Sequence, residues 1–210
     1  MKLGEIKLQA VRVGFPDFFF SCDENNPESL VATIHALKRN ASFSGFVEAC
    51  TGAINRAFAY IEAKGLGQVS CVDYFSNLCK KRKGGYIELP MPKDATCVER
   101  VVFQNGDGRY YFTFEVEGES IITEDKEGTY TVVYRKRIPR VTSVTSDTYE
   151  VEGPEGLIEY VPYFVAAETL AAKGEGTPQT IMAVFEDMIA FMSKKGLPCQ
   201  SCFETRYSLR

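Results

Sequence analysis

The sequence predicts an α+β fold in which N- and C-terminal helices pack together and an antiparallel β-meander is inserted between them. Apolar residues recur every three to four positions up to about residue 64 and again from about residue 162, as in amphipathic helices. Between residues 96 and 134 they alternate with polar residues, the period of a half-buried strand. We expect an N-terminal helical part (1–85), a β-meander (86–156), a C-terminal helical hairpin (157–196) and a polar tail (197–210).

The N-terminal part should contain three helices. The spacing predicts a first helix over residues 2–13, and Asn26-Pro27-Glu28 begins a second with an N-cap, a proline at the first helical position and an acid in the first turn. The third, over 44–64, has the strongest apolar stripe, which includes the expected core residues Ile54 and Phe58. Asn55 lies beside this stripe, where it would bond a backbone group or mark an interface.

Two alternating runs identify the central strands. One expected strand face carries Tyr110, Phe112, Phe114 and Val116, opposite Tyr111, Thr113 and Glu115, and a second carries Tyr130, Val132 and Tyr134. Turn sequences at 105–108, 117–118 and 125–128 separate the strands at meander spacing. The basic run 80–83 is expected to be a solvated loop, with contact to nucleic acid as the alternative.

The C-terminal part should be a pair of helices. The first runs from about Pro162 to Lys173, and Thr177-Pro178 begins the second. Phe185 and Ile189 lie at the centre of the second stripe and should be buried.

The composition argues against several function classes. A net charge of −4 argues against tight binding of nucleic acid, because surfaces that bind nucleic acid tightly are normally basic. Charged residues interrupt the first segment, so we expect neither a secretory leader nor a membrane span, and a cytoplasmic location. The sole histidine, His35, lies on a helix flank, and Cys199 and Cys202 lack a second close ligand pair. We therefore expect no metal, no cofactor and no enzyme activity.

Opposite charges at two parts of the meander form our candidate interface. The acidic residues are Glu117, Glu119, Glu124 and Asp125, flanked by Glu115 and Glu127. The basic residues are Arg135, Lys136, Arg137 and Arg140. These charges either keep exposed strands soluble or allow the acidic turns of one copy to meet the basic segment of the next.

Several segments carry a resemblance to known proteins. They are the opening Met1-Lys-Leu-Gly-Glu-Ile-Lys-Leu-Gln-Ala10, Ala53-Ile-Asn-Arg-Ala57, the stretch from Leu89-Pro to Val101, Val161-Pro-Tyr-Phe-Val-Ala-Ala-Glu-Thr-Leu170 and Phe185-Glu186. In these segments the chain resembles the small head-tail connector, neck or adaptor-type structural proteins of tailed bacteriophages and prophages. The resemblance implies a non-enzymatic subunit that works in multiple copies, as a possible homo-oligomeric ring, and contacts portal, neck or tail subunits. It would be cytoplasmic during assembly and then part of the virion.

Two other functions remain as alternatives. A β-sheet module that binds a carbohydrate or another ligand would use Tyr110, Tyr111 and Tyr130, provided that they are exposed in one cluster. A small enzyme is the third possibility, although the sequence offers no nucleophile with a matching base.

Overall fold

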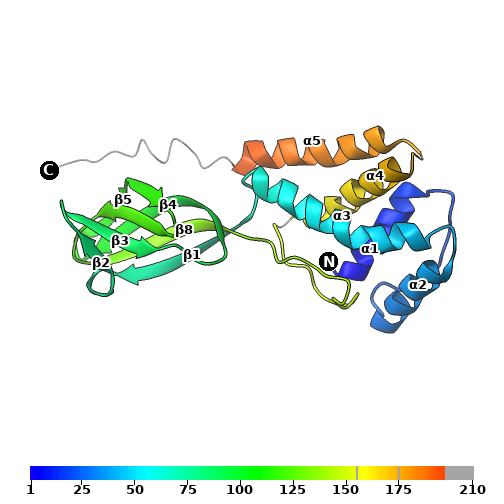
Figure 1. Cartoon of the computed structure of the whole chain (residues 1–210), viewed down its shortest axis with the longest axis horizontal. Coiled ribbons are helices and arrows are strands. Elements are labelled where there is room, and N and C mark those ends of the chain that lie inside the picture. Colours follow the sequence, from blue (N-terminus) through cyan, green and yellow to red (C-terminus); the bar gives the residue numbers. More distant parts are fainter. Residues whose placement is uncertain (155, 175, 197–210) are drawn as a thin grey trace. The chain divides into compact units, whose positions relative to one another are not determined.

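The computed structural model describes residues 1–154, 156–174 and 176–196 (Figure 1). It divides into two compact units. Of the described residues, the helical unit combines Met1–Leu66 with residues 138–196, and the β unit comprises Gly67–Arg137. The fold is α+β, with helices on both sides of the strands in the sequence, as predicted.

Three helices precede the strands: α1 (Leu3–Gly14), α2 (Pro27–Arg39) and α3 (Ser44–Ala63). Their starts follow local chemistry. Asn26 caps α2, because its Oδ1 accepts hydrogen bonds from the backbone N–H groups of Glu28 (2.9 Å) and Ser29 (3.4 Å). The side chain of Glu5 accepts the backbone N–H of Lys2 at 2.8 Å at the start of α1.

Two helices follow the strands, α4 (Val161–Lys173) and α5 (Pro178–Gly196), with a short 3₁₀ turn, η2 (Ile158–Tyr160), before α4. Helix α4 is the centre of the unit, because it contacts α1, α3 and α5. It ends at Gly174, whose φ of 70° is left-handed and therefore suits glycine. Helices from both ends of the chain thus share one core, as predicted.

The predicted core of the helical unit is confirmed. Ile54, Phe58 and Phe185 are fully buried and Ile189 is 4% exposed. The ring of Phe185 packs edge-on to Phe164, with centroids 5.1 Å apart. Val184, which precedes Phe185 on α5, is 40% exposed.

The irregular segment from Ile138 to Leu157 belongs to the helical unit. The side-chain amide of Asn55 binds both backbone groups of Val141, donating to its carbonyl (2.7 Å) and accepting from its N–H (3.0 Å). Lys2 forms an isolated antiparallel bridge with Glu150. The predicted extension of the meander to residue 156 is therefore wrong, because this segment finds its partners on α1 and α3.

The β unit contains two four-stranded antiparallel sheets. The first has the order β1-β8-β4-β5, with β1 Gln68–Phe75, β8 Thr129–Lys136, β4 Ala95–Asn105 and β5 Gly108–Phe112. The second has the order β2-β3-β7-β6, with β2 Lys80–Arg82, β3 Tyr86–Pro90, β7 Ser120–Glu124 and β6 Phe114–Glu117. A 3₁₀ turn, η1 (Ser76–Leu78), links β1 to β2.

The strand order is not that of a meander. β8 lies between β1 and β4, and β7 lies between β3 and β6. In addition, β1 and β2 fall within the range 1–85 that we predicted to be helical, and the basic run is a strand rather than a loop. Strand β1 pairs with β8, far away in the sequence, so local turn sequences do not reveal that pairing. Strand β2 pairs instead with the nearby β3 across residues 83–85, a local hairpin whose dense basic residues led us to expect a solvated loop.

The two sheets share one apolar core. Its buried residues are Ile87, Leu89, Val101, Phe103, Ile121, Tyr130, Val132 and Tyr134. The predicted face of Tyr130, Val132 and Tyr134 is thus confirmed. The predicted strand over 110–116 is divided at Thr113, where the chain leaves the first sheet as β5 and enters the second as β6.

Candidate interaction site

The sheet β2-β3-β7-β6 carries a network of paired charges. Arg82 on β2 binds two carboxylates, with Nε 3.0 Å from Glu88 Oε2 and an Nη atom 2.6 Å from Glu117 Oε2. Ser120 Oγ donates a further hydrogen bond of 2.7 Å to Glu88 Oε1. These contacts arise because β2 pairs with β3 and β3 with β7, which brings Lys80 and Ser120 to either side of the Glu88–Pro90 stretch.

Glu88 is the most strongly perturbed carboxylate in this network. The hydrogen bond from Ser120 and then that from Arg82 lower its pKa to about 2, and Lys80 adds to the effect. The carboxylate therefore stays ionised and holds the basic strand β2 against β3. The basic run 80–83 was the alternative site for nucleic acid, but most of its positive charges form ion pairs within the chain. Lys80 pairs with Glu88, and Lys81 pairs with Asp125.

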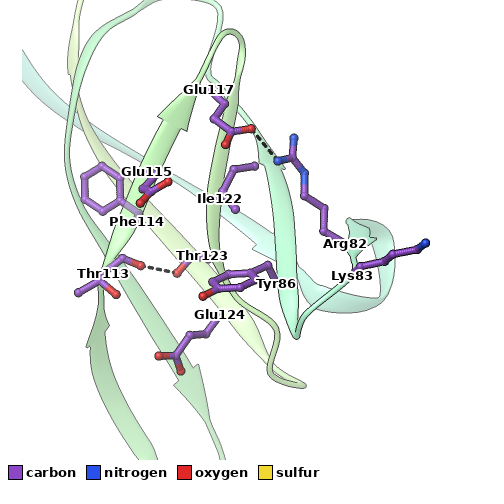
Figure 2. A pocket seen from close by; sticks show the side chains of 10 residues that line it. All are labelled: Arg82, Lys83, Tyr86, Thr113, Phe114, Glu115, Glu117, Ile122, Thr123 and Glu124. Atoms are coloured by element: carbon purple, nitrogen blue, oxygen red, sulfur yellow. Dashed lines mark hydrogen bonds and ion pairs between the residues drawn. The ribbon is translucent and has the colours of Figure 1, made fainter.

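A shallow hollow of about 520 Å³ lies on the same sheet (Figure 2). Tyr86 and Ile122 line it, and Figure 2 shows Arg82 and Glu117 joined at one end and Glu124 toward the other. Charges of both signs line it beside a small apolar surface. This mixture suits a polar peptide or side chain of a protein partner better than a single anion or cation.

The predicted basic segment does not form one free patch. Arg135 is held by Glu99, with Nε 2.5 Å from Oε1, and donates to the carbonyl of Gly67 at 2.8 Å. Arg140 belongs to the helical unit, where its guanidinium lies 2.5 Å from Glu62. Lys136, the last residue of β8, is half-buried, whereas Arg137 is exposed.

The predicted acidic residues also have partners within the chain. Glu117 binds Arg82, Asp125 Oδ2 lies 3.0 Å from Lys81, and Glu124 lies 3.5 Å from Lys126. Glu119 is exposed in the turn between β6 and β7. Among the residues that the structure describes, Glu119 and Arg137 therefore remain the members of the predicted interface that are best placed to meet another molecule.

The three tyrosines of the ligand-binding alternative do not gather in one cluster. Tyr130 is fully buried, and its hydroxyl donates to the carbonyl of Glu124 (2.7 Å) and accepts the N–H of Lys126 (2.7 Å). Tyr110 and Tyr111 are 39% and 43% exposed, but as neighbours in one strand they point to opposite faces. This arrangement gives no stacking platform for a sugar.

Strand β1 is the feature that the sequence analysis missed. It forms one end of the first sheet and exposes Val69 and Phe75. The β-branched and aromatic residues between Val69 and Phe75 favour a strand, but Asp73 shares a strand face with Val69 and Phe75, so polar and apolar residues do not alternate cleanly. This segment lay directly after the strongest predicted helix and inside a part that we expected to be helical.

No group of three His, Cys, Asp or Glu side chains is placed to hold a metal ion in the described part of the chain. Cys199 and Cys202 lie outside the described residues, and His35 is exposed on α2. Over the same described part, no helix has the length and apolar character to span a bilayer.

A comparison with protein-family models and with curated protein sequences finds no match for this chain.

Proposed function

We propose that the chain is a non-enzymatic assembly protein of a tailed bacteriophage or prophage, a head-tail connector or neck subunit that works in multiple copies. The observation that carries this proposal is the placement of the segments that resemble such proteins. Residues 1–10 lie largely in α1, 53–57 in α3, 161–170 in α4 and Phe185-Glu186 in α5. Helix α4 contacts the other three, so segments far apart in the sequence form one packing unit.

The burial of α4 explains why its sequence matters for the packing of the helical unit. Val161, Val165, Ala166 and Leu170 are at most 1% exposed, which means that α4 is covered on several sides. The small side chain of Ala166 allows a close approach of neighbouring helices. A resemblance that resides in such a buried helix concerns the fold of the whole unit, and it supports the proposal more strongly than scattered surface matches would.

The partners in this proposal are other virion proteins, namely portal, neck or tail subunits, and adjacent copies of the chain. For the charged interface between copies, the structure favours the exposed Arg137 and Glu119 as the contacting groups. Exposed ion pairs contribute only about 0–1 kcal/mol each, so they would set the register of an assembly and weaken with salt. Assembly would take place in the cytoplasm.

The proposal is tested by deleting the gene from an inducible prophage that carries it and supplying the protein from a plasmid. We expect the deletion to give heads and tails that electron microscopy finds unjoined, and the plasmid to restore infectious particles that contain the chain. Full particle yield from the deletion would refute the function.

The same system tests the charged interface separately. Arg137→Glu should keep the melting temperature of the wild type and lower the particle yield, whereas Lys93→Glu, a charge reversal at another exposed residue, should not. Normal yield from Arg137→Glu would refute the interface and leave the function standing.

A further inference from the structure

The first sheet ends in strand β1, whose outer backbone edge is unpaired. Ser76, directly after β1, donates its N–H to the carbonyl of Gly128 at 3.0 Å, so this residue faces β8. Inward-facing and outward-facing residues alternate along an antiparallel strand, and the register with β8 runs without a shift. The residues whose backbone N–H and C=O groups point away from β8, toward no described segment, are therefore Val69, Cys71, Asp73 and Phe75.

This edge lacks the features that usually protect a sheet edge, namely short length, lysines, prolines or bulges. Strand β2, which ends the second sheet, has such features, because its three residues are all basic. Strand β1 has eight residues, contains neither proline nor lysine and carries a single charge, on Asp73. Its side chains Val69 and Phe75 are 48% and 54% exposed. Such an edge favours pairing with another strand.

Strand β1 is complementary to itself in an antiparallel pair. When Val72 of one copy lies opposite Val72 of a second copy, nearly the whole of each β1 overlaps, because this residue is near the middle of Gln68–Phe75. Each Val69 then lies opposite a Phe75, and each Cys71 opposite an Asp73. These are the outward-facing residues, so each opposed pair exchanges two backbone hydrogen bonds.

Neighbouring registers, displaced by two residues, lose this match. One of them places the two Asp73 carboxylates opposite each other, and like charges in that position are destabilising. The other places Val69 opposite Asp73 and leaves Phe75 with no β1 residue opposite it. The side chains on the exposed face of β1 therefore select the register centred on Val72.

The inner face of β1 also suits this register. Val72 and Tyr74 are half-buried and pack against the apolar core of the β unit. Opposed side chains of an antiparallel pair project to the same side of the sheet, so Val72 would contact Val72 of the second copy and Tyr74 would lie opposite Ser70. Both faces of β1 thus gain apolar contacts from an identical strand.

We propose that two copies of this chain form a symmetric dimer in which their β1 edges pair antiparallel about Val72 and join the first sheets into one continuous sheet. A contact between identical surfaces is closed and joins two copies only. One pair of strands buries less than the roughly 800 Å² per partner of a standard stable interface, so the association is weak. The proposal goes beyond the proposed function and does not depend on it.

Charge substitutions at Cys71 test the pairing in sedimentation equilibrium of the full chain, from micromolar to millimolar concentrations. Cys71 is exposed and would lie opposite Asp73, whose carboxylate is fixed on this edge because Oδ1 accepts from Thr131 at 2.6 Å. Cys71→Arg should strengthen the dimer about fivefold and Cys71→Asp should weaken it by a similar factor. Cys97→Arg and Cys97→Asp are the matched controls and should change nothing, because Cys97 is exposed on the interior strand β4.

A disulfide at the symmetry axis tests the register. In the variant Cys71→Ser with Val72→Cys, mild oxidation should link the two copies through residue 72. Opposed residues of a non-hydrogen-bonded pair have Cα atoms about 4.5 Å apart, within the range of a disulfide. Ser70→Cys in the same Cys71→Ser background is the control, since Ser70 is also half-buried on the inner face but lies away from the axis. Peptide mapping identifies the linked residue.

Three results would overturn the proposal: a wild type that stays monomeric at millimolar concentration, equal association of Cys71→Arg and Cys71→Asp, or no link through residue 72. A Cys71–Cys71 link in the oxidised wild type, or a link through Ser70→Cys, would show a different register and would also overturn it. Because these measurements need no phage, their failure is distinguishable from a failure of the complementation experiment.

Discussion

Removing the buried cation Lys7 should destabilise the helical unit severely. Its Nζ lies 2.6 Å from Asp147 Oδ1, and the two side chains are only 6% and 9% exposed. The carbonyl of Asp147 accepts the N–H of Gly4 at 2.8 Å, so the carboxylate is held in place when its partner is lost. Lys7→Met would leave an unpaired buried charge, which costs roughly 3–5 kcal/mol. For a unit of this size the melting temperature should fall by roughly 10–20 °C.

Differential scanning calorimetry of the full chain would measure this shift. Lys38→Met provides the matched control, because Lys38 is exposed on α2 and the same substitution there should change little. The double variant Lys7→Met with Asp147→Leu should regain much of the loss, since no buried charge remains. A melting temperature of Lys7→Met within the error of the wild type would refute the assignment of a buried ion pair.

Two further predictions concern the core and the acid stability of the β unit. Phe185→Ala should lower the free energy of unfolding by roughly 3–5 kcal/mol in chemical denaturation, because the ring is fully buried, whereas Val184→Ala beside it should have a small effect; equal curves for Phe185→Ala and the wild type would contradict this. The folded-state pKa of Glu88, about 2, lies below its ordinary value of 4.5, so Glu88 stabilises the β unit above pH 4.5 and this contribution is lost as the pH falls toward 2. Glu88→Gln should therefore flatten the dependence of stability on pH between these values, and an unchanged acid titration would show that the network does not control it.

The helices could be predicted because their information is local. The apolar spacing of α3 and the Asn26-Pro27 start of α2 lie within single turns of the chain. Lys7 shows the limit of this reasoning. A lysine on an amphipathic helix is normally a surface residue, and its carboxylate partner is 140 residues away. The role of Asn55 was easier to predict, because an amide beside an apolar stripe is expected to bond a backbone group. The identity of that partner, Val141, could not be predicted from the sequence.

The β unit and the candidate interface were harder to predict for the same physical reason. Period-two alternation identified Tyr130, Val132 and Tyr134 as a buried face, but it could not show that β8 separates β1 from β4. The charges of the predicted interface were read as free because their partners are brought near by strand pairing. Arg82 and Glu117, for example, meet only when β2, β3, β7 and β6 form one sheet.

The continuity of the β unit determines which part of the protein can fold first during synthesis. Residues 67–137 form one uninterrupted stretch, whereas the helical unit needs Phe58 of α3 and Phe185 of α5 in the same core. A ribosome that has released about the first 140 residues has exposed all the strands β1–β8 of the described structure, but α4 and α5 are still missing. The apolar faces of α1 and α3 that pack against α4 then stay exposed to solvent until the rest of the chain is synthesised. We expect nascent chains stalled at that point to resist proteolysis in the β unit and to be cleaved in α1–α3.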